Sequence, residues 1–261
     1  IMKSMTNETV LRVALEQSAR DSGCRAEDFL RAANVVVESA ANPEARKYLA
    51  LPFSCDLTSY GGNIVASVAP ELRETVTDYI GRFSPEHCFE TPNLHVLMDA
   101  LRPRGLNACF MAEYWLPDMG RLRPLESPYA LRVLTQADFA ALYLPEWSNA
   151  LCEKRRELDV LGVGAYDGGK LIGLAGCSAD CETMWQIGVD VLPDYRRQGV
   201  AAAMTSRLAL ECAARGKVPF YCCAWSNIRS ARNAVRSGFR PAWAQLTVKP
   251  EAEIARLNGA D

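Results

Sequence analysis

Residues 196–201 have the composition of a helix start that binds an anion. A strand pattern ends at Val191, a turn with a proline follows, and a helical pattern begins at Gly199. The first N–H groups of a helix lack acceptors within the helix and carry partial positive charge, so they bind phosphate. Arg196 and Arg197 add positive charge, and Gly199 has no Cβ to keep a ligand from the backbone. From these residues alone, the segment is either a phosphate site or an ordinary helix start with two exposed arginines.

Two motifs resemble those of a known family, whereas the P-loop and the dinucleotide-binding glycine patterns are both absent. They are Arg196-x-x-Gly199-x-Ala201, and Asn227-x-x-Ser230 followed by Gly238-Phe239. In this order and spacing they resemble the GNAT superfamily of N-acetyltransferases, over roughly residues 128–250. The whole chain is similar, more weakly, to a bacterial subgroup of this length with an N-terminal extension domain.

The resemblance implies that acetyl-CoA is the cosubstrate and that no metal is needed. Acetyl-CoA would bind at the point where two parallel strands separate, which here are 183–191 and 218–225. The Val189 amide, at a bulge typical of the family, would donate to the thioester carbonyl and stabilise the developing oxyanion. The Val191 backbone would pair with the pantetheine arm. The cofactor-binding residues implied are Val189, Val191, Arg196, Arg197, Gln198, Gly199, Val200, Ala201, Asn227 and Ser230.

The sequence departs from the family at the groups that move protons. The usual acid, a tyrosine seven residues after the asparagine, is replaced by Ala234. The usual positions of the base correspond to Trp185 and Ile187, and neither side chain accepts a proton. We therefore predict Glu182, acting through a water, and Glu113, with a raised pKa, as catalytic candidates besides the Val189 amide. The alternative is that both are solvated carboxylates.

Three aromatic residues are candidates for binding the acceptor. Trp185 and Trp225 would form walls of its pocket, or pack in the core. Tyr60 lies in the polar stretch 54–63, which is either a substrate loop or a capped turn. Tyr221, on the second of the two separating strands, is interpreted as structural.

The elements that must position these residues indicate an α/β protein with two domains. We expect a GNAT acyltransferase fold, a mixed sheet flanked by helices, over 125–261. Its elements are a hairpin (160–166 and 170–177) around Asp167-Gly168-Gly169, strands 183–191, 218–225 and 241–249, and helices 199–215 and 228–237.

Residues 1–124 predict a smaller domain, helical and then mixed α/β, which is a candidate degenerate copy of the GNAT fold. The boundary lies in the proline-containing stretch 121–128. The expected elements are helices 9–20, 26–41, 71–83 and 93–101, a short helix after Asn42-Pro43, and strands 63–68, 87–90 and 108–116.

The composition argues against a nucleic-acid-binding protein and against a metal site. The net charge is −2, with 49% hydrophobic and 23% charged residues, so the chain has a core and no basic excess for nucleic acid. Ten scattered cysteines and two histidines favour reduced thiols over a metal site, with Cys55 and the Cys222–Cys223 pair as the candidates for reactivity. The first residues have no apolar signal-peptide core, so we expect a cytoplasmic protein.

We therefore expect an acetyltransferase that moves an acetyl group from acetyl-CoA to a primary amine by direct transfer in a ternary complex. The acceptor would be a small molecule or a peptide, with no nucleic-acid or membrane partner, and a homodimer is the candidate assembly. Two alternatives remain. One is an acyl-CoA-binding regulatory protein without turnover, and the other is an interaction module.

Overall fold

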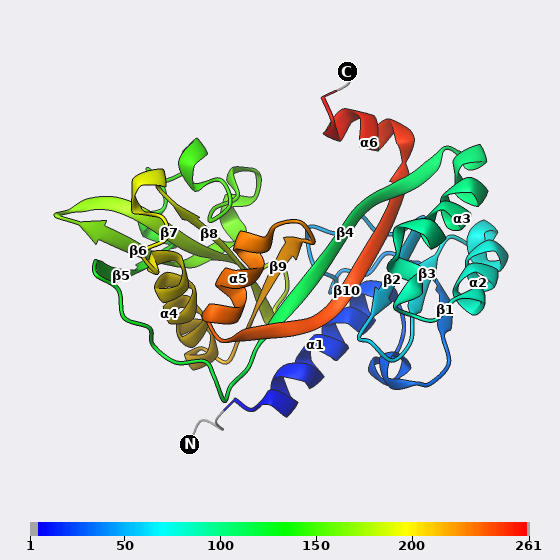
Figure 1. Cartoon of the computed structure of the whole chain (residues 1–261), viewed down its shortest axis with the longest axis horizontal. Coiled ribbons are helices and arrows are strands. Elements are labelled where there is room, and N and C mark those ends of the chain that lie inside the picture. The colour runs from blue at the N-terminus through cyan, green and yellow to red at the C-terminus, as the bar shows by residue number, and fades with distance from the viewer. Residues whose placement is uncertain (1–4, 260–261) are drawn as a thin grey trace. The chain divides into compact units, whose positions relative to one another are not determined.

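The computed structural model describes residues 5–259, which fold into two compact units (Figure 1). Of these residues, unit 1 comprises 5–14 and 115–241, and unit 2 comprises 15–114 and 242–259. The division differs from the predicted boundary at 124/125, because the described residues after Pro241 belong to the unit that contains most of the N-terminal half. It falls within the helix α1 (Asn7–Ser22) and within two long strands, β4 (Leu106–Pro117) and β10 (Phe239–Pro250).

Unit 1 contains a mixed sheet in the order β9-β8-β7-β6-β5. The strands are β5 (Ala130–Thr135), β6 (Asp159–Asp167), β7 (Lys170–Ser178), β8 (Met184–Val191) and β9 (Val218–Ala224). The first four are antiparallel neighbours, whereas β8 and β9 are parallel and are joined by helix α4 (Val200–Ala214). Helix α5 (Ile228–Arg236) follows β9. The predicted mixed sheet with flanking helices is confirmed.

One face of this sheet packs against α4 through an apolar core that includes Ile187, Met204, Leu208 and Tyr221. The other face is covered by the segment between β5 and β6, through Phe139, Trp147, Leu151 and their neighbours. That segment forms short 3-10 turns at Gln136–Asp138, Pro145–Trp147 and Glu153–Leu158.

Unit 2 contains the strand order β1-β3-β2-β10-β4. The remaining bounds are β1 (Val35–Glu38), β2 (Cys55–Ser59), β3 (Val65–Val68), α2 (Arg73–Arg82), α3 (Thr91–Leu101) and α6 (Glu251–Leu257). One sheet face is apolar and packs on α2 and α3, for example through Leu57 and Leu246. This confirms a helical and α/β N-terminal portion.

Several predicted elements of unit 2 are wrong for identifiable reasons. Residues 26–41 form a 3-10 turn (Ala26–Leu30) and then β1, because three consecutive valines pair with β3 and β-branched side chains favour a strand. The side chain of Asn42 accepts from the Glu44 amide in a turn, and no helix follows it. The expected strand at 87–90 is a 3-10 turn, His87–Phe89.

Candidate active site

Strands β8 and β9 are hydrogen-bonded over only half of β8. Their parallel register runs from Met184 opposite Val218 to Ile187 opposite Tyr221, and it ends there. Residues 188–191 of β8 and 222–224 of β9 continue as strands without pairing to each other. The carboxyl ends of two adjacent parallel strands therefore separate, next to the start of α4.

The register of β7 on β8 shows which backbone groups point into this separation. The pairing is regular from Ser178–Gln186 to Gly173–Val191, and the Leu192 amide then donates to the Ile172 carbonyl at 3.0 Å. Because hydrogen-bonded and non-bonded pairs alternate in an antiparallel ladder, the even-numbered residues of β8 bond to β7. The N–H groups of Val189 and Val191 therefore point away from β7, toward the side on which β9 has departed.

The regular register also corrects one expectation, since β8 has no bulge at Val189. The outward orientation of the Val189 amide follows instead from the alternation of bonded and non-bonded residues along β8. The Val191 carbonyl accepts a hydrogen bond from Arg196 Nε at 2.9 Å, which leaves its N–H as the group available to a ligand.

The loop before α4 presents a row of free backbone amides. Among residues 5–259, the amides of Arg197, Gln198, Gly199, Val200 and Ala201 have no hydrogen-bond acceptor, and the N-cap residue Gly199 supplies no side-chain cap. Arg197 and Gly199 both have left-handed backbone, with φ of 64° and 83°. This conformation turns successive N–H groups toward one side, as in anion-binding loops.

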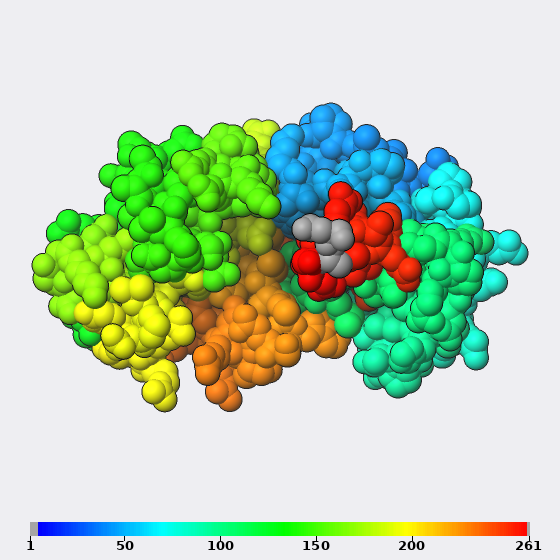
Figure 2. Space-filling model, turned by 90° about the horizontal axis from the view of Figure 1, so that it is seen from above, coloured from blue at the N-terminus to red at the C-terminus, as the bar shows by residue number. Residues whose placement is uncertain are grey.

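Helix α5 begins after the unpaired end of β9 with a second polar group, and its C-terminal end lies beside the loop, with Arg236 Nη2 3.3 Å from the position of a Cβ on Gly199. Asn227 caps the helix, its Oδ1 accepting from the Ser230 amide at 3.2 Å. The Ser230 hydroxyl lies 2.7 Å from the hydroxyl of Tyr221, the last β9 residue paired with β8. Burial raises the pKa of Tyr221, so this hydroxyl keeps its proton at neutral pH. Figure 2 shows the segment around the loop, in yellow, next to α5, in orange, on one face of unit 1.

On the sheet face opposite α4, the turn at Asn149 and Ala150 lies directly on β7 and β8, close to the point where β8 and β9 separate. Gly176 and Gly188 are cross-strand partners, and a Cβ added at either would overlap the carbonyl oxygen of Ala150 or Asn149. The Asp190 carboxylate holds the turn in place by accepting from the Asn149 and Ala150 amides, both at 2.9 Å, and from Asn149 Nδ2 at 2.7 Å. The turn was not predicted from the sequence, although glycines inside predicted strands are a signal for close backbone approach.

The sequence of this region matches a known family. The model of the family described as GNAT acetyltransferase matches residues 118–242, slightly less than half of the chain. Residues 118–242 form a GNAT acetyltransferase domain. No curated protein matches the chain.

Several solved structures resemble the chain. A GCN5-related N-acetyltransferase from Sphaerobacter thermophilus is 14% identical over 92% of both chains, with a TM-score of 0.46. A GNAT-family protein from Novosphingobium aromaticivorans is 21% identical over 55% of this chain and 66% of its own, with a TM-score of 0.43. A protein from Salmonella typhimurium, 18% identical over 48% of this chain and 95% of its own (TM-score 0.36), was solved with its cofactor acetyl-CoA. This chain thus covers just under two thirds of the Novosphingobium protein.

Within the GNAT domain, the structure places Glu182 and Trp185 away from the strand separation. Glu182 precedes β8 at its paired end, where its carbonyl accepts from Lys217 Nζ. From the first residue of β8, Met184, to Val189 there are five residue steps of strand, which span about 17 Å. Trp185 lies opposite Pro219 in the paired half and beside Lys217, with the Lys217 Nζ 5.9 Å from the ring. Both residues thus lie at the paired end of β8 and not at the separation, and Glu182 as a base acting through a water and Trp185 as a pocket wall stay predictions.

Trp225 remains a candidate for contacting a ligand of the GNAT domain. It follows directly after the unpaired end of β9 and is 51% exposed, which is high for a tryptophan. An exposed indole beside the separated strands offers a flat apolar surface.

The two site candidates outside the GNAT domain belong to unit 2. Tyr60 is half-buried at the turn after the buried strand β2, its hydroxyl bonded to the Ser18 hydroxyl at 2.8 Å and its ring stacked on Trp243 at 5.4 Å. These contacts give it a structural role, and its role as a substrate residue stays a prediction. Glu113 lies half-buried on β4, and burial raises its pKa. Its catalytic role stays a prediction.

All ten cysteines are free thiols. Cys55 is fully buried and burial raises its pKa, so it is unreactive, contrary to its selection as a candidate. Cys222 is half-buried and its sulfur accepts from Gln186 Nε2 at 3.1 Å. No group of three or more His, Cys, Asp or Glu side chains that could hold a metal occurs within residues 5–259. Over the same range, no helix is both long and apolar enough to cross a membrane.

Proposed function

We propose that this protein transfers an acetyl group from acetyl-CoA to a primary amine, in one step within a ternary complex. The observation that carries this is the end of β8–β9 pairing at Ile187 and Tyr221, with the Val189 and Val191 amides turned into the separation. A pantetheine arm has amide groups that can bond to such a strand edge. The free amides of residues 197–201 lie at the end of β8, where the pyrophosphate of the same molecule would bind.

The residues fit this cosubstrate in charge and in shape. The pyrophosphate carries two negative charges, and the loop offers a helix start and two arginines. Gly199 leaves the backbone open on the ligand side, and its φ of 83° is a conformation that other residues adopt only with strain.

In the proposed reaction, the acceptor nitrogen attacks the thioester carbonyl carbon and the carbonyl oxygen gains negative charge. The Val189 N–H donates to that oxygen, which stabilises the tetrahedral state. The C–N bond then forms fully as the nitrogen loses a proton to solvent, the C–S bond breaks, and the thiolate takes a proton. Holding the two substrates in the reactive geometry supplies most of the remaining rate acceleration.

Tyr221 is our candidate for the proton donor. The family's tyrosine is replaced by Ala234, which is fully buried, but the Tyr221 hydroxyl lies between β9 and α5 at the last paired position before the separation. Its proton would pass to the sulfur, and the half-buried Ser230 hydroxyl would replace it from solvent.

The first test is calorimetric titration with acetyl-CoA, in wild type and in Gly199→Glu. We expect binding at about micromolar Kd, near −8 kcal/mol, for the wild type. The glutamate places a strained, negatively charged side chain among the free amides, so it should weaken binding at least about a hundredfold. Thermal melts of the variant establish that it is folded. Equal affinity for both proteins would show that the loop does not bind the pyrophosphate.

Turnover is then measured by chromatography of released CoA against a panel of amines, because ten cysteines would react with thiol reagents. A second candidate function, acyl-CoA binding without turnover, is favoured by the absence of a protonatable side chain at Ala234, Trp185 and Ile187. Tight binding of acetyl-CoA with no CoA release from any amine would support that function instead.

A further inference from the structure

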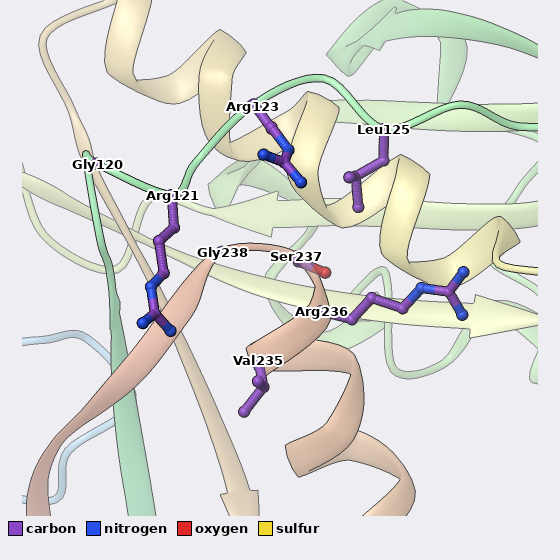
Figure 3. Close-up of a pocket in the computed structure, with 8 residues that line it drawn as sticks. All are labelled: Gly120, Arg121, Arg123, Leu125, Val235, Arg236, Ser237 and Gly238. Carbon is purple, nitrogen blue, oxygen red and sulfur yellow. The ribbon is translucent and has the colours of Figure 1, made fainter.

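Unit 1 has a cavity on the side of α4 and α5 where the loop lies. Its volume is about 320 Å³, and its walls are the segment before β5 and the end of α5 (Figure 3). The lining residues are Gly120, Arg121, Arg123, Leu125, Val235, Arg236, Ser237 and Gly238.

The walls of the cavity are held by specific contacts. The backbone at Leu122 lies so close to Gly238 that a Cβ there would be 2.9 Å from the Leu122 Cα. The Asp118 amide donates to the Gly238 carbonyl at 2.8 Å, and the Ser206 hydroxyl of α4 donates to the Arg123 carbonyl. The cavity is therefore a built feature of the domain, with fixed backbone on both sides.

Two arginines of the cavity carry charge that is not neutralised. Among the described residues, neither Arg123 nor Arg236 has an acidic partner, whereas Arg121 lies 3.7 Å from Asp118. Figure 3 shows the Arg123 side chain directed toward α4, whereas the Arg121 side chain is directed away from that helix. An open pocket with unpaired guanidinium groups and no carboxylate among its lining residues is suited to an anion.

Arg236 connects this cavity to the loop. Its side chain lines the cavity, and its Nη2 lies 3.3 Å from the position that a Cβ on Gly199 would occupy. The free amides of the loop and the Arg123 guanidinium are thus two anion sites with one arginine between them. A ligand that matches them has two phosphate groups on one short linker, and Leu125 and Val235 provide apolar surface for a ring attached to that linker.

We propose that this cavity binds the 3′-phosphate of the CoA moiety, with Arg123 as its principal ligand and Arg236 shared with the pyrophosphate. This inference rests on the proposed function and extends it, because it makes the protein selective for 3′-phosphorylated CoA. The adenosine would lie between the two phosphate sites, against Leu125 and Val235.

The test compares the Kd of acetyl-CoA with that of 3′-dephospho-acetyl-CoA in four proteins: wild type, Arg123→Ala, Arg236→Ala and Arg215→Ala. Removing a charge-assisted contact to phosphate at an open site costs about tenfold in Kd. We expect the wild type to prefer acetyl-CoA by about tenfold or more. Arg123→Ala should abolish the preference and leave the affinity for the dephospho compound unchanged. Arg236→Ala should weaken both ligands.

Arg215→Ala is the matched control. It removes one positive charge at the far end of α4, about 22 Å from Val200, where Arg215 pairs with Glu211. It should leave both Kd values unchanged. All three positions are exposed and the Arg123 contact to α4 is made by its carbonyl, so the variants should fold.

Failure of the inference differs from failure of the proposed function. If the wild type binds both ligands equally, or if Arg123→Ala weakens both alike, the cavity does not hold the 3′-phosphate. If inorganic phosphate binds the wild type but not Arg123→Ala, with no preference between the two CoA forms, the cavity is a free-phosphate site and the inference is overturned. If neither CoA form binds, the proposed function itself is wrong.

Discussion

At the residue scale, the helix position where the GNAT family usually has its tyrosine is Ala234, and we propose Tyr221 on the sheet as the proton donor instead. Ala234 is buried and inert, whereas the Tyr221 hydroxyl lies at the last paired position of β9, bonded to Ser230. Our sequence analysis treated Tyr221 as structural. Sequence position alone could not show that its hydroxyl meets the start of α5.

Tyr221→Phe should therefore reduce kcat while KM for acetyl-CoA stays unchanged. The ring and its packing are retained, and only the proton donor is lost. The expected loss is about a hundredfold, as is usual for a general acid. Steady-state kinetics with the best amine of the panel measure it, together with the pH profile of kcat. Loss of stability with intact kcat would assign Tyr221 to the fold alone.

At the element scale, the separation of β8 from β9 depends on pairing rules rather than on a local motif. The β7–β8 ladder fixes which amides of β8 face outward, and β9 stops pairing after Tyr221. On the other face, the Gly176–Gly188 pair allows the turn at Asn149 and Ala150 to lie on the strands, held by Asp190.

Gly188→Ala should destabilise the GNAT domain by about 3 kcal/mol, because its methyl group would overlap the Asn149 carbonyl and the turn would have to move. Denaturant unfolding measures the change. Gly81→Ala in α2 is the control, since no atom lies within 4 Å of the added Cβ. It should stabilise its helix by up to about 1 kcal/mol. If Gly188→Ala left the free energy of unfolding unchanged, the turn would be loosely held.

At the scale of the whole molecule, each unit has an apolar core, around α4 in the GNAT domain and against α2 and α3 in unit 2. On its other face, the sheet of unit 2 also holds a buried carboxyl group, Asp56, which accepts from Thr58, Gln245 and Thr247. Burial raises the pKa of Asp56 to about 6, despite these donors.

Unit 2 should consequently become less stable as the pH rises from about 4 to about 6. The folded state holds the Asp56 proton up to about pH 6, whereas an unfolded aspartate loses it near pH 4. Between these two pH values the folded state binds more protons than the unfolded state. Raising the pH through this range therefore lowers the free energy of unfolding by roughly 2–3 kcal/mol, and above about pH 6 it falls no further from this cause. Asp56→Asn should remove this component in urea unfolding between pH 4 and 8. A pH dependence identical to the wild type would contradict it.

The sequence by itself determined the elements whose signals are local. The helix start at Gly199, the hairpin around Gly168-Gly169 and the two family motifs follow from residue type and spacing, and they identified the GNAT domain. Tertiary structure decided the rest, because strand pairing and burial join residues that are far apart in the chain. The polar stretch at Cys55–Ser59 became a buried strand since β3 and β10 flank it. Residues 242–259 belong to unit 2 for the same reason, and the tertiary fold alone brings Arg123 next to the end of α5.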